Sequence, residues 1–219
     1  MAPVLPVVVI ARVPAPGHAK TRLIPALGPE GAAALARAMT EDVIAVVRAS
    51  GLPFRVAWTG NTDDAWVIAQ DVPGERQADG DLGAKLRHAL RDGGIAIGSD
   101  APTLSPTLLV QAAERLADHD AVWAPAFDGG YVLVGARAAC GGAGGIFDDV
   151  PWSAPDTLAA SVARARALGL RHALLPFWYD VDEPQDLSFL ATHLRALPPS
   201  VAPATRAFLQ DSPHAAPHR

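Results

Sequence analysis

The chain of 219 residues is poor in several residue types, and each shortage argues against a class of protein. Its one cysteine, Cys140, cannot form an internal disulfide or a cysteine-rich zinc site, which favours a reducing compartment such as the cytoplasm. Only 19% of the residues are charged, the net charge is −5, and no run of five Lys or Arg residues occurs. This composition gives no support for nucleic-acid binding. We therefore expect small-molecule partners.

Long hydrophobic runs are also missing. The apolar run near the N-terminus, VLPVVVIA, is short, contains Pro6 and lacks a basic flank, so we expect neither a signal peptide nor a membrane span. Apolar residues nevertheless make up 50% of the chain, which is enough for one substantial core. We predict one domain over residues 1–197. A Pro- and Ala-rich tail follows at 198–219, with at most one short helix at 204–210 and disorder in about its last eight residues.

Strand and helix patterns alternate along the chain. Apolar runs rich in β-branched residues predict strands at 7–11, 54–58, 95–98 and 171–177, and two more within 121–136, broken at 128–130. Amphipathic or capped segments predict helices at 28–51, 62–70, within 80–94, and at 105–119, 154–168 and 184–197. Such alternation is typical of a mostly parallel sheet with helices on both faces. We therefore predict an α/β, Rossmann-like fold.

Ligands of such folds bind at the carboxyl ends of the strands, so the residues after each strand indicate function. The first strand is followed by PAPGHAKTRL, a Gly/Pro loop with two cations, Lys20 and Arg22. This loop lacks the glycine spacing of a P-loop or a dinucleotide fingerprint. Its amides and cations still suit phosphate, with Arg22 able to bind two oxygens. The alternative is that both cations are simply solvated at the start of a helix.

Carboxylates follow two other strands. Asp100 comes directly after the strand at 95–98, and Asp180 and Asp182 flank Val181, so these two should point the same way in an extended segment. Mg²⁺ prefers one or two carboxylates together with phosphate oxygens, so these residues are candidate metal ligands. Asp100 could instead form a turn or cap, and Asp182 could be an acidic residue at a helix start. We expect Asp186 to be mainly structural.

Six motifs, in order, resemble those of the DUF2064 family: PAPGHAKTRL, GDLG, GSDAPTLS, PAFDGGYVLVG, VPWS and YDVDEPQDL. Members are labelled CofC-like, radical-SAM/selenodomain-associated transferases or glycosyltransferases. The resemblance covers roughly residues 7–190. It implies the GT-A, or nucleotide-diphospho-sugar transferase, superfamily, which also holds molybdopterin-cofactor guanylyltransferases and 2-phospholactate guanylyltransferase. The implied fold is a single domain with a seven-stranded, mainly parallel sheet.

The resemblance also implies roles for individual residues. Lys20 and Arg22 would hold the nucleotide phosphates beside Pro16 and Gly17, and Asp100 would act with them and bind the metal, Mg²⁺ or Mn²⁺. Asp180 or Asp182 would be the second metal ligand. Two further groups would contact the substrates: the nucleobase or ribose would meet Gly80 and Asp81, and the acceptor would meet Asp128, Gly129, Gly130, Tyr131 and Trp152.

Two reactions fit these residues. In nucleotidyl transfer, a phosphorylated acceptor attacks an NTP and needs no general base, which suits the cationic loop and is slightly favoured by it. In glycosyl transfer from an NDP-sugar, a carboxylate base is needed near the acceptor, and Asp128 or Asp180 could serve. The third possibility is a non-catalytic nucleotide-binding domain. Such a domain is expected to have lost one or more of the acidic metal-binding residues, whereas this sequence has all of them. The sequence does not specify the nucleobase, the acceptor or the oligomeric state.

Overall fold

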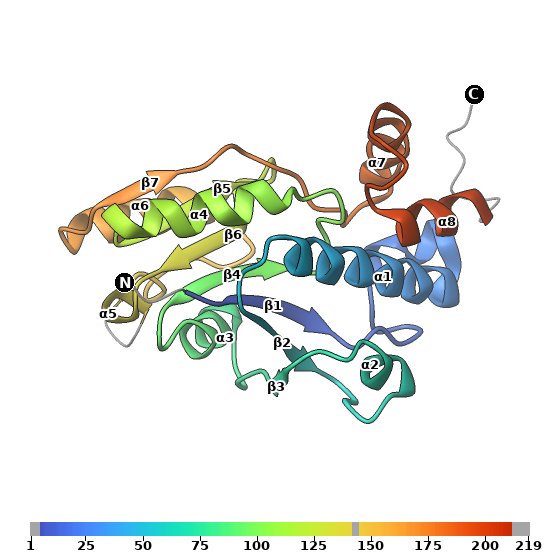
Figure 1. Cartoon of the computed structure of the whole chain (residues 1–219), viewed down its shortest axis with the longest axis horizontal. Coiled ribbons are helices and arrows are strands. Elements are labelled where there is room, and N and C mark those ends of the chain that lie inside the picture. The colour runs from blue at the N-terminus through green and yellow to red at the C-terminus, as the bar shows by residue number, and fades with distance from the viewer. Residues whose placement is uncertain (1–4, 142–144, 212–219) are drawn as a thin grey trace.

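A computed structural model describes residues 5–141 and 145–211 of the chain (Figure 1). Its centre is a seven-stranded sheet with the strand order β3-β2-β1-β4-β6-β5-β7. The strands are β1 (Val7–Arg12), β2 (Phe54–Thr59), β3 (Gly74–Arg76), β4 (Gly94–Gly98), β5 (Ala121–Pro125), β6 (Tyr131–Ala136) and β7 (His172–Leu174). Four of the six strand pairings are parallel, and only β6 runs antiparallel to its neighbours. The predicted mostly parallel α/β fold is confirmed.

Helices cover both faces of the sheet. They are α1 (Ile24–Ala49), α2 (Ala65–Ala69), α3 (Leu82–Ala89), α4 (Pro106–Asp118), α5 (Ala138–Gly141), α6 (Thr157–Ala167), α7 (Pro184–Ala196) and α8 (Pro203–Asp211). Along β1, Val7 and Val9 pack with α1 and α4, whereas Val8 packs with α3 on the other face. This alternation is the period of two that a strand buried on both faces requires. No helix within the described residues combines the length and apolarity needed to cross a membrane.

Four local features differ from the sequence prediction. Strand β7 is one of them, since it spans only His172–Leu174 of the predicted 171–177. Helix α1 begins at Ile24 and is kinked at Gly28, whose φ of 70° is accessible to glycine, so the helix starts one turn before the predicted position. Strand β3 was not predicted because it has only three residues at the edge of the sheet and no alternating pattern. Helix α5, which contains the buried Cys140, was not among the predicted helices.

The predicted short helix near the C-terminus is α8, and it is tied to the domain by a carboxylate of α1. Asp42 is only 3% exposed and accepts hydrogen bonds from the backbone N–H groups of Ala204 (3.1 Å) and Thr205 (2.8 Å). It thereby caps α8 from a distant part of the chain. Burial raises the pKa of Asp42, and these hydrogen bonds oppose the rise. The disorder predicted for the last eight residues concerns 212–219, which lie outside the described residues.

Asp42→Ala is expected to lower the free energy of unfolding by about 2–3 kcal/mol, because two helix N–H groups lose a charged acceptor. Urea denaturation followed by circular dichroism measures this loss. Asp42→Asn is the matched control: it retains one carbonyl acceptor and should lose less. Equal stability of the parent and the alanine variant would show that α8 does not depend on Asp42.

Candidate active site

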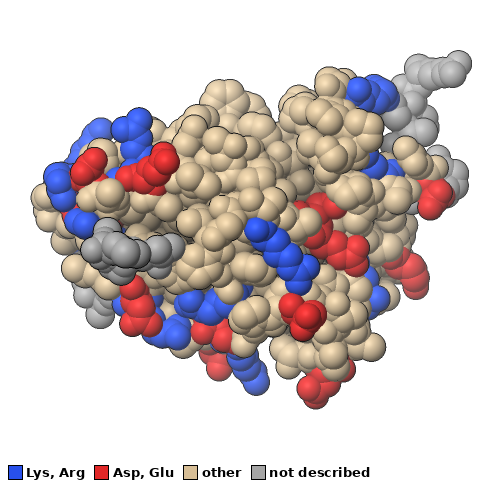
Figure 2. Space-filling model, in the orientation of Figure 1, with Lys and Arg blue, Asp and Glu red and all other residues tan. Residues whose placement is uncertain are grey.

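The carboxyl ends of β1 and β4 meet the chain segment that leads into α7. The backbone N–H of Val181 donates to the carbonyl of Asp100 (3.0 Å), and Trp178 N–H donates to the carbonyl of Pro125 (2.9 Å). These two bonds hold the segment from Trp178 to Asp182 across the ends of β4 and β5. Acidic and basic side chains are intermixed on the face of the molecule shown in Figure 2.

The loop after β1 places its two cations differently. Lys20 has a φ of 44°, in the left-handed region, and directly precedes a short 3₁₀ helix at Thr21–Leu23. Its side chain is 13% exposed, and its ammonium lies 3.1 Å from an oxygen of Asp100 and 2.5 Å from one of Asp182. Burial lowers the pKa of Lys20, but the two carboxylates outweigh it and raise the pKa overall. The ammonium is therefore charged at neutral pH.

Arg22 is more loosely held. Its side chain is 66% exposed, and its guanidinium lies 3.9 Å from Asp182 and 3.8 Å from Glu183. Contacts of this length between exposed groups contribute little to stability. Arg22 is therefore free to turn toward an anion without a large cost.

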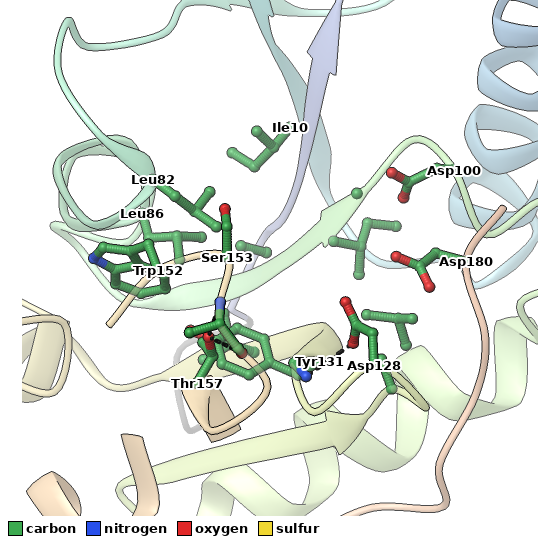
Figure 3. A pocket seen from close by; sticks show the side chains of 18 residues that line it. Ile10, Leu82, Leu86, Asp100, Asp128, Tyr131, Trp152, Ser153, Thr157 and Asp180 are labelled. Carbon is green, nitrogen blue, oxygen red and sulfur yellow. Dashed lines mark hydrogen bonds between the residues drawn. The ribbon is translucent and has the colours of Figure 1, made fainter. Parts of the chain in front are cut away.

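Three aspartates face one another beside this loop. Asp100, Asp128 and Asp180 point into a common space in Figure 3. Burial raises the pKa of Asp180 to about 7, with further contributions from the negative charges of Asp100, Asp182 and Asp128. Within the described part of the chain, no Lys, Arg or His lies within ion-pair distance of Asp180. Asp180 is thus an acidic group in a negative environment, without a cationic partner.

The prediction that Asp180 and Asp182 point the same way, on either side of Val181, agrees with the structure. Val181 is fully buried against α1 and α7, while Asp180 and Asp182 both line one cavity. Their partners differ, because Asp182 is engaged by Lys20 and Asp180 is not. No group of three or more His, Cys, Asp or Glu residues placed to hold a metal occurs within 5–141 and 145–211. Among the described residues, a metal at this site would therefore have at most two protein carboxylate ligands.

Glycine allows two of the acidic side chains to take up these positions. A Cβ on Gly98, the last residue of β4, would collide with the carboxylate of Asp100. Gly129 has a φ of 88°, and a Cβ there would overlap the carbonyl of Pro155, while Gly130 N–H donates to Asp128 Oδ1 (2.8 Å). Both turns therefore depend on the absence of a side chain.

Three hollows meet at these residues. The inner cavity, of about 300 Å³, is mainly apolar and reaches Asp100, Asp128 and Asp180 at one end (Figure 3). The basic cavity, of about 510 Å³, is lined by residues 17–22 together with Asp100 and Asp182. The outer cavity, of about 480 Å³, is lined by Asp128, Asp180 and the start of α7. Asp100 joins the inner and basic cavities, and Asp180 joins the inner and outer cavities.

The residues of the GDLG motif and Trp152 come together in the inner cavity. Leu82 lines it together with Trp152, and a Cβ on Gly83 would lie 2.7 Å from the Trp152 indole nitrogen. Asp81, predicted to contact base or ribose, uses its Oδ1 to cap α3 by accepting from Ala84 N–H (2.8 Å). Trp152, predicted on the acceptor side, therefore lies next to the predicted nucleoside-binding motif. Gly80 precedes this cap with a φ of 109°.

The remaining predicted residues divide between the cavities. Gly17 lines the basic cavity, whereas Pro16 is not among its lining residues. Gly130 and Tyr131 line the inner cavity, where the Tyr131 hydroxyl is buried and has no hydrogen-bond partner among the described residues. Asp186 has the structural role predicted for it, since its Oδ2 accepts from the N–H groups of Asp182 (2.9 Å) and Glu183 (2.7 Å) at the start of α7.

Sequence reasoning missed three residues of the site. Arg12, at the carboxyl end of β1, lines the basic cavity and adds a third cation to it. Its position directly after a buried strand could have indicated this role. Phe127 and Phe189 line the outer cavity and are 72% and 50% exposed. No pattern in the sequence separates these two phenylalanines from those of the core.

Comparison with solved structures places the chain among transferase folds. It is 28% identical to a "putative nucleotide-diphospho-sugar transferase" from Desulfovibrio desulfuricans G20, with a TM-score of 0.82 and coverage of 94% of this chain and 97% of that one. It also resembles a CMP:2-keto-3-deoxy-manno-octonic acid synthetase complexed with CTP, at 15% identity, TM-score 0.57 and coverage of 88% and 100%. A nucleotidyl transferase from Methanothermobacter thermautotroptrophicus is 18% identical to this chain, with a TM-score of 0.56 and coverage of 89% of this chain and 99% of that one. The last two likenesses show a shared fold. No curated protein matches the sequence.

Residues 41–154 match a family described as uncharacterised proteins conserved in bacteria, DUF2064. The match covers more than half of the chain and includes β4, Asp100 and the loop around Asp128. It confirms the resemblance drawn from the six sequence motifs, and the chain belongs to the DUF2064 family.

Proposed function

We propose that this chain is a nucleotide-dependent transferase that takes a glycosyl group from a nucleoside diphosphate sugar. The observation that carries the proposal is the arrangement around Asp100. Lys20 and Arg22 line the basic cavity on one side of it, and Asp128 and Asp180 share the inner cavity on the other. Donor phosphates need cations, and a hydroxyl acceptor needs a nearby base. The description of the 28% identical structure is in keeping with such a donor.

Asp100 and Asp180 are the residues that we propose as ligands of Mg²⁺ or Mn²⁺. Their carboxylates face each other, and Asp180 has no cationic partner among the described side chains. Two carboxylates plus phosphate oxygens and water are a usual set for Mg²⁺, so a third protein ligand is not required. Bound here, the cation would help to neutralise the leaving diphosphate. Asp182 is the weaker candidate, because its contact with Lys20 (2.5 Å) is shorter than that of Asp100 (3.1 Å) and because it does not line the inner cavity that Asp100 and Asp180 share.

In the proposed reaction, the acceptor oxygen forms a bond to the anomeric carbon of the sugar. The bond from that carbon to the diphosphate oxygen breaks, and the nucleoside diphosphate leaves with the bonding electrons. Asp128 is placed to take the hydroxyl proton: Gly130 holds its Oδ1, and its Oδ2 has no hydrogen-bond partner among the described residues. Lys20 and Arg22 bind and orient the diphosphate.

Nucleotidyl transfer is the second candidate, and the charge of the basic cavity favours it. Arg12, Lys20 and Arg22 all line this cavity, which could accommodate the additional phosphate of an NTP. An acceptor oxygen would then bond to the α-phosphorus while pyrophosphate leaves. The two candidates differ in the nucleotide that they require, so binding can separate them.

A thermal-shift screen of NTPs, NDPs and NDP-sugars with Mg²⁺ or Mn²⁺ tests the proposal. A nucleotide at ~100 times its dissociation constant should stabilise the protein by roughly 2.7 kcal/mol. We expect an NDP-sugar and its NDP to give the largest shifts, and to do so only with a divalent cation. A preference for one NTP over every NDP-sugar would reverse the order of the two reactions. No shift with any nucleotide would contradict the proposed function.

Arg22→Ala is expected to weaken nucleotide binding by about 1.5–3 kcal/mol, the scale of a hydrogen bond to a charged group. The stability of the free protein should change little, because the ion pairs of Arg22 with described residues are long and exposed to solvent. Isothermal titration with the nucleotide identified in the screen measures the effect. Arg171→Ala is the matched control, since Arg171 is 63% exposed and pairs with Asp120. Unchanged affinity of the Arg22 variant would remove Arg22 from the phosphate site.

A further inference from the structure

The outer cavity has an aromatic wall built from two separate elements. Phe127 comes from the loop before Asp128, and Phe189 comes from α7. Phe189 packs edge-on against Tyr179 at 4.7 Å between ring centroids, and the Tyr179 hydroxyl lies 2.9 Å from His193 Nδ1. Phe127 packs edge-on against Phe177 at 5.1 Å. These neighbours hold the two rings in place although both are at least half exposed to solvent.

Carboxylates outnumber cations among the residues that line the same cavity. One cation, Arg22, is opposed by five carboxylates, those of Asp128, Asp180, Asp182, Glu183 and Asp186. Asp182 and Asp186 are engaged by Lys20 and by the start of α7, whereas Asp128 and Asp180 face the centre of the site. With Asp180 assigned to the proposed metal, a phosphorylated or carboxylated molecule entering here would still meet the carboxylates of Asp128 and Glu183 at short range, which disfavours its binding. A hydroxyl group, in contrast, can donate to carboxylate oxygens.

We propose that the outer cavity binds the acceptor, and that this acceptor is a hydroxylated ring compound without negative charge, one face of which packs on Phe127. The inference rests on the proposed function, because it assigns the second substrate of the same site. Position supports it, since Asp128 and Asp180 line both the outer and the inner cavity and so connect the acceptor to the transfer centre. Chemistry supports it as well, because aromatic faces and carboxylates together match the apolar faces and hydroxyl groups of such a ring.

A matched pair of probes tests the charge of the acceptor: phenyl β-D-glucopyranoside, which is neutral, and its 6-phosphate. Saturation-transfer NMR with the whole chain measures their binding, with and without Mg²⁺ and a nucleoside diphosphate. We expect the neutral probe to bind and the phosphorylated probe to bind at least fivefold more weakly. Equal or tighter binding of the phosphorylated probe would overturn the proposal, and so would failure of the neutral probe to bind.

Phe127→Ala tests the position of the acceptor. It should weaken binding of the neutral probe by about two- to tenfold, which corresponds to the loss of one aromatic contact. Ile68→Ala is the matched control, because Ile68 is 68% exposed and lies on α2, outside the outer cavity. Equal probe affinity in the parent and the Phe127 variant would overturn the assignment. Affinity for Mg²⁺ with nucleoside diphosphate, measured separately, should not change; its absence in the parent would contradict the proposed function instead.

Discussion

Asp100→Asn is expected to reduce metal-dependent nucleotide turnover by about 10²–10³-fold, the scale of losing one group that stabilises transition-state charge. Asp100 joins the inner and basic cavities, faces Asp180 and binds the ammonium of Lys20. Asparagine preserves the shape of the side chain but removes its charge, so it is a poor ligand for Mg²⁺. Affinity for nucleotide should become insensitive to the divalent cation. Titrating Mn²⁺ into protein and nucleotide, with a parallel activity assay, measures both effects.

The structure also allows Asp100 to act only as a turn residue, and the same variant separates the two roles. The backbone carbonyl of Asp100, which accepts from Val181 N–H, is retained in asparagine. The melting temperature should therefore stay close to that of the parent, and Asp63→Asn, at an exposed site before α2, serves as the matched control. Normal Mn²⁺ and nucleotide binding by Asp100→Asn would move the proposed metal site toward Asp180 and Asp182.

Lys20→Met is expected to weaken nucleotide binding by about 100-fold, because it removes the buried cation of the loop after β1, which we propose to hold the nucleotide phosphates, and leaves Asp100 and Asp182 without their shared counter-charge. Nucleotide phosphates would then approach two uncompensated carboxylates. The variant should fold, because both carboxylates keep contact with water, at 32% and 42% side-chain exposure. Isothermal titration of nucleotide in the presence of Mg²⁺ measures the loss.

The control for this prediction is Lys85→Met, which changes the only other lysine of the chain, on α3. It should bind nucleotide as the parent does. Added Mg²⁺ without nucleotide should raise the melting temperature of Lys20→Met more than that of the parent, since the cation would replace the lost ammonium. If Lys20→Met bound nucleotide normally, Lys20 would have only a structural role as partner of Asp100 and Asp182.

Local patterns in the sequence were sufficient to predict the fold class and one edge of the site. Strands such as β1 and β4 are continuous apolar runs, and helices such as α4 begin at a Ser cap followed by Pro, so short-range chemistry specifies them. Parallel strands present their carboxyl ends at one edge, so the order of the strands and loops in the sequence is enough to group Lys20, Arg22 and Asp100 there.

The tertiary structure decided which of these charged groups pair and what surrounds them. Asp180 and Asp182 have the same local sequence features, yet only Asp182 binds Lys20, because Val181 is anchored to Asp100 and α1 by long-range contacts. The outer cavity likewise joins Phe127 to Phe189, which are 62 positions apart in the sequence. Periodicity reports which face of one element is buried, but distances between loops depend on how all the elements pack, and that packing sets the charge and shape of the site.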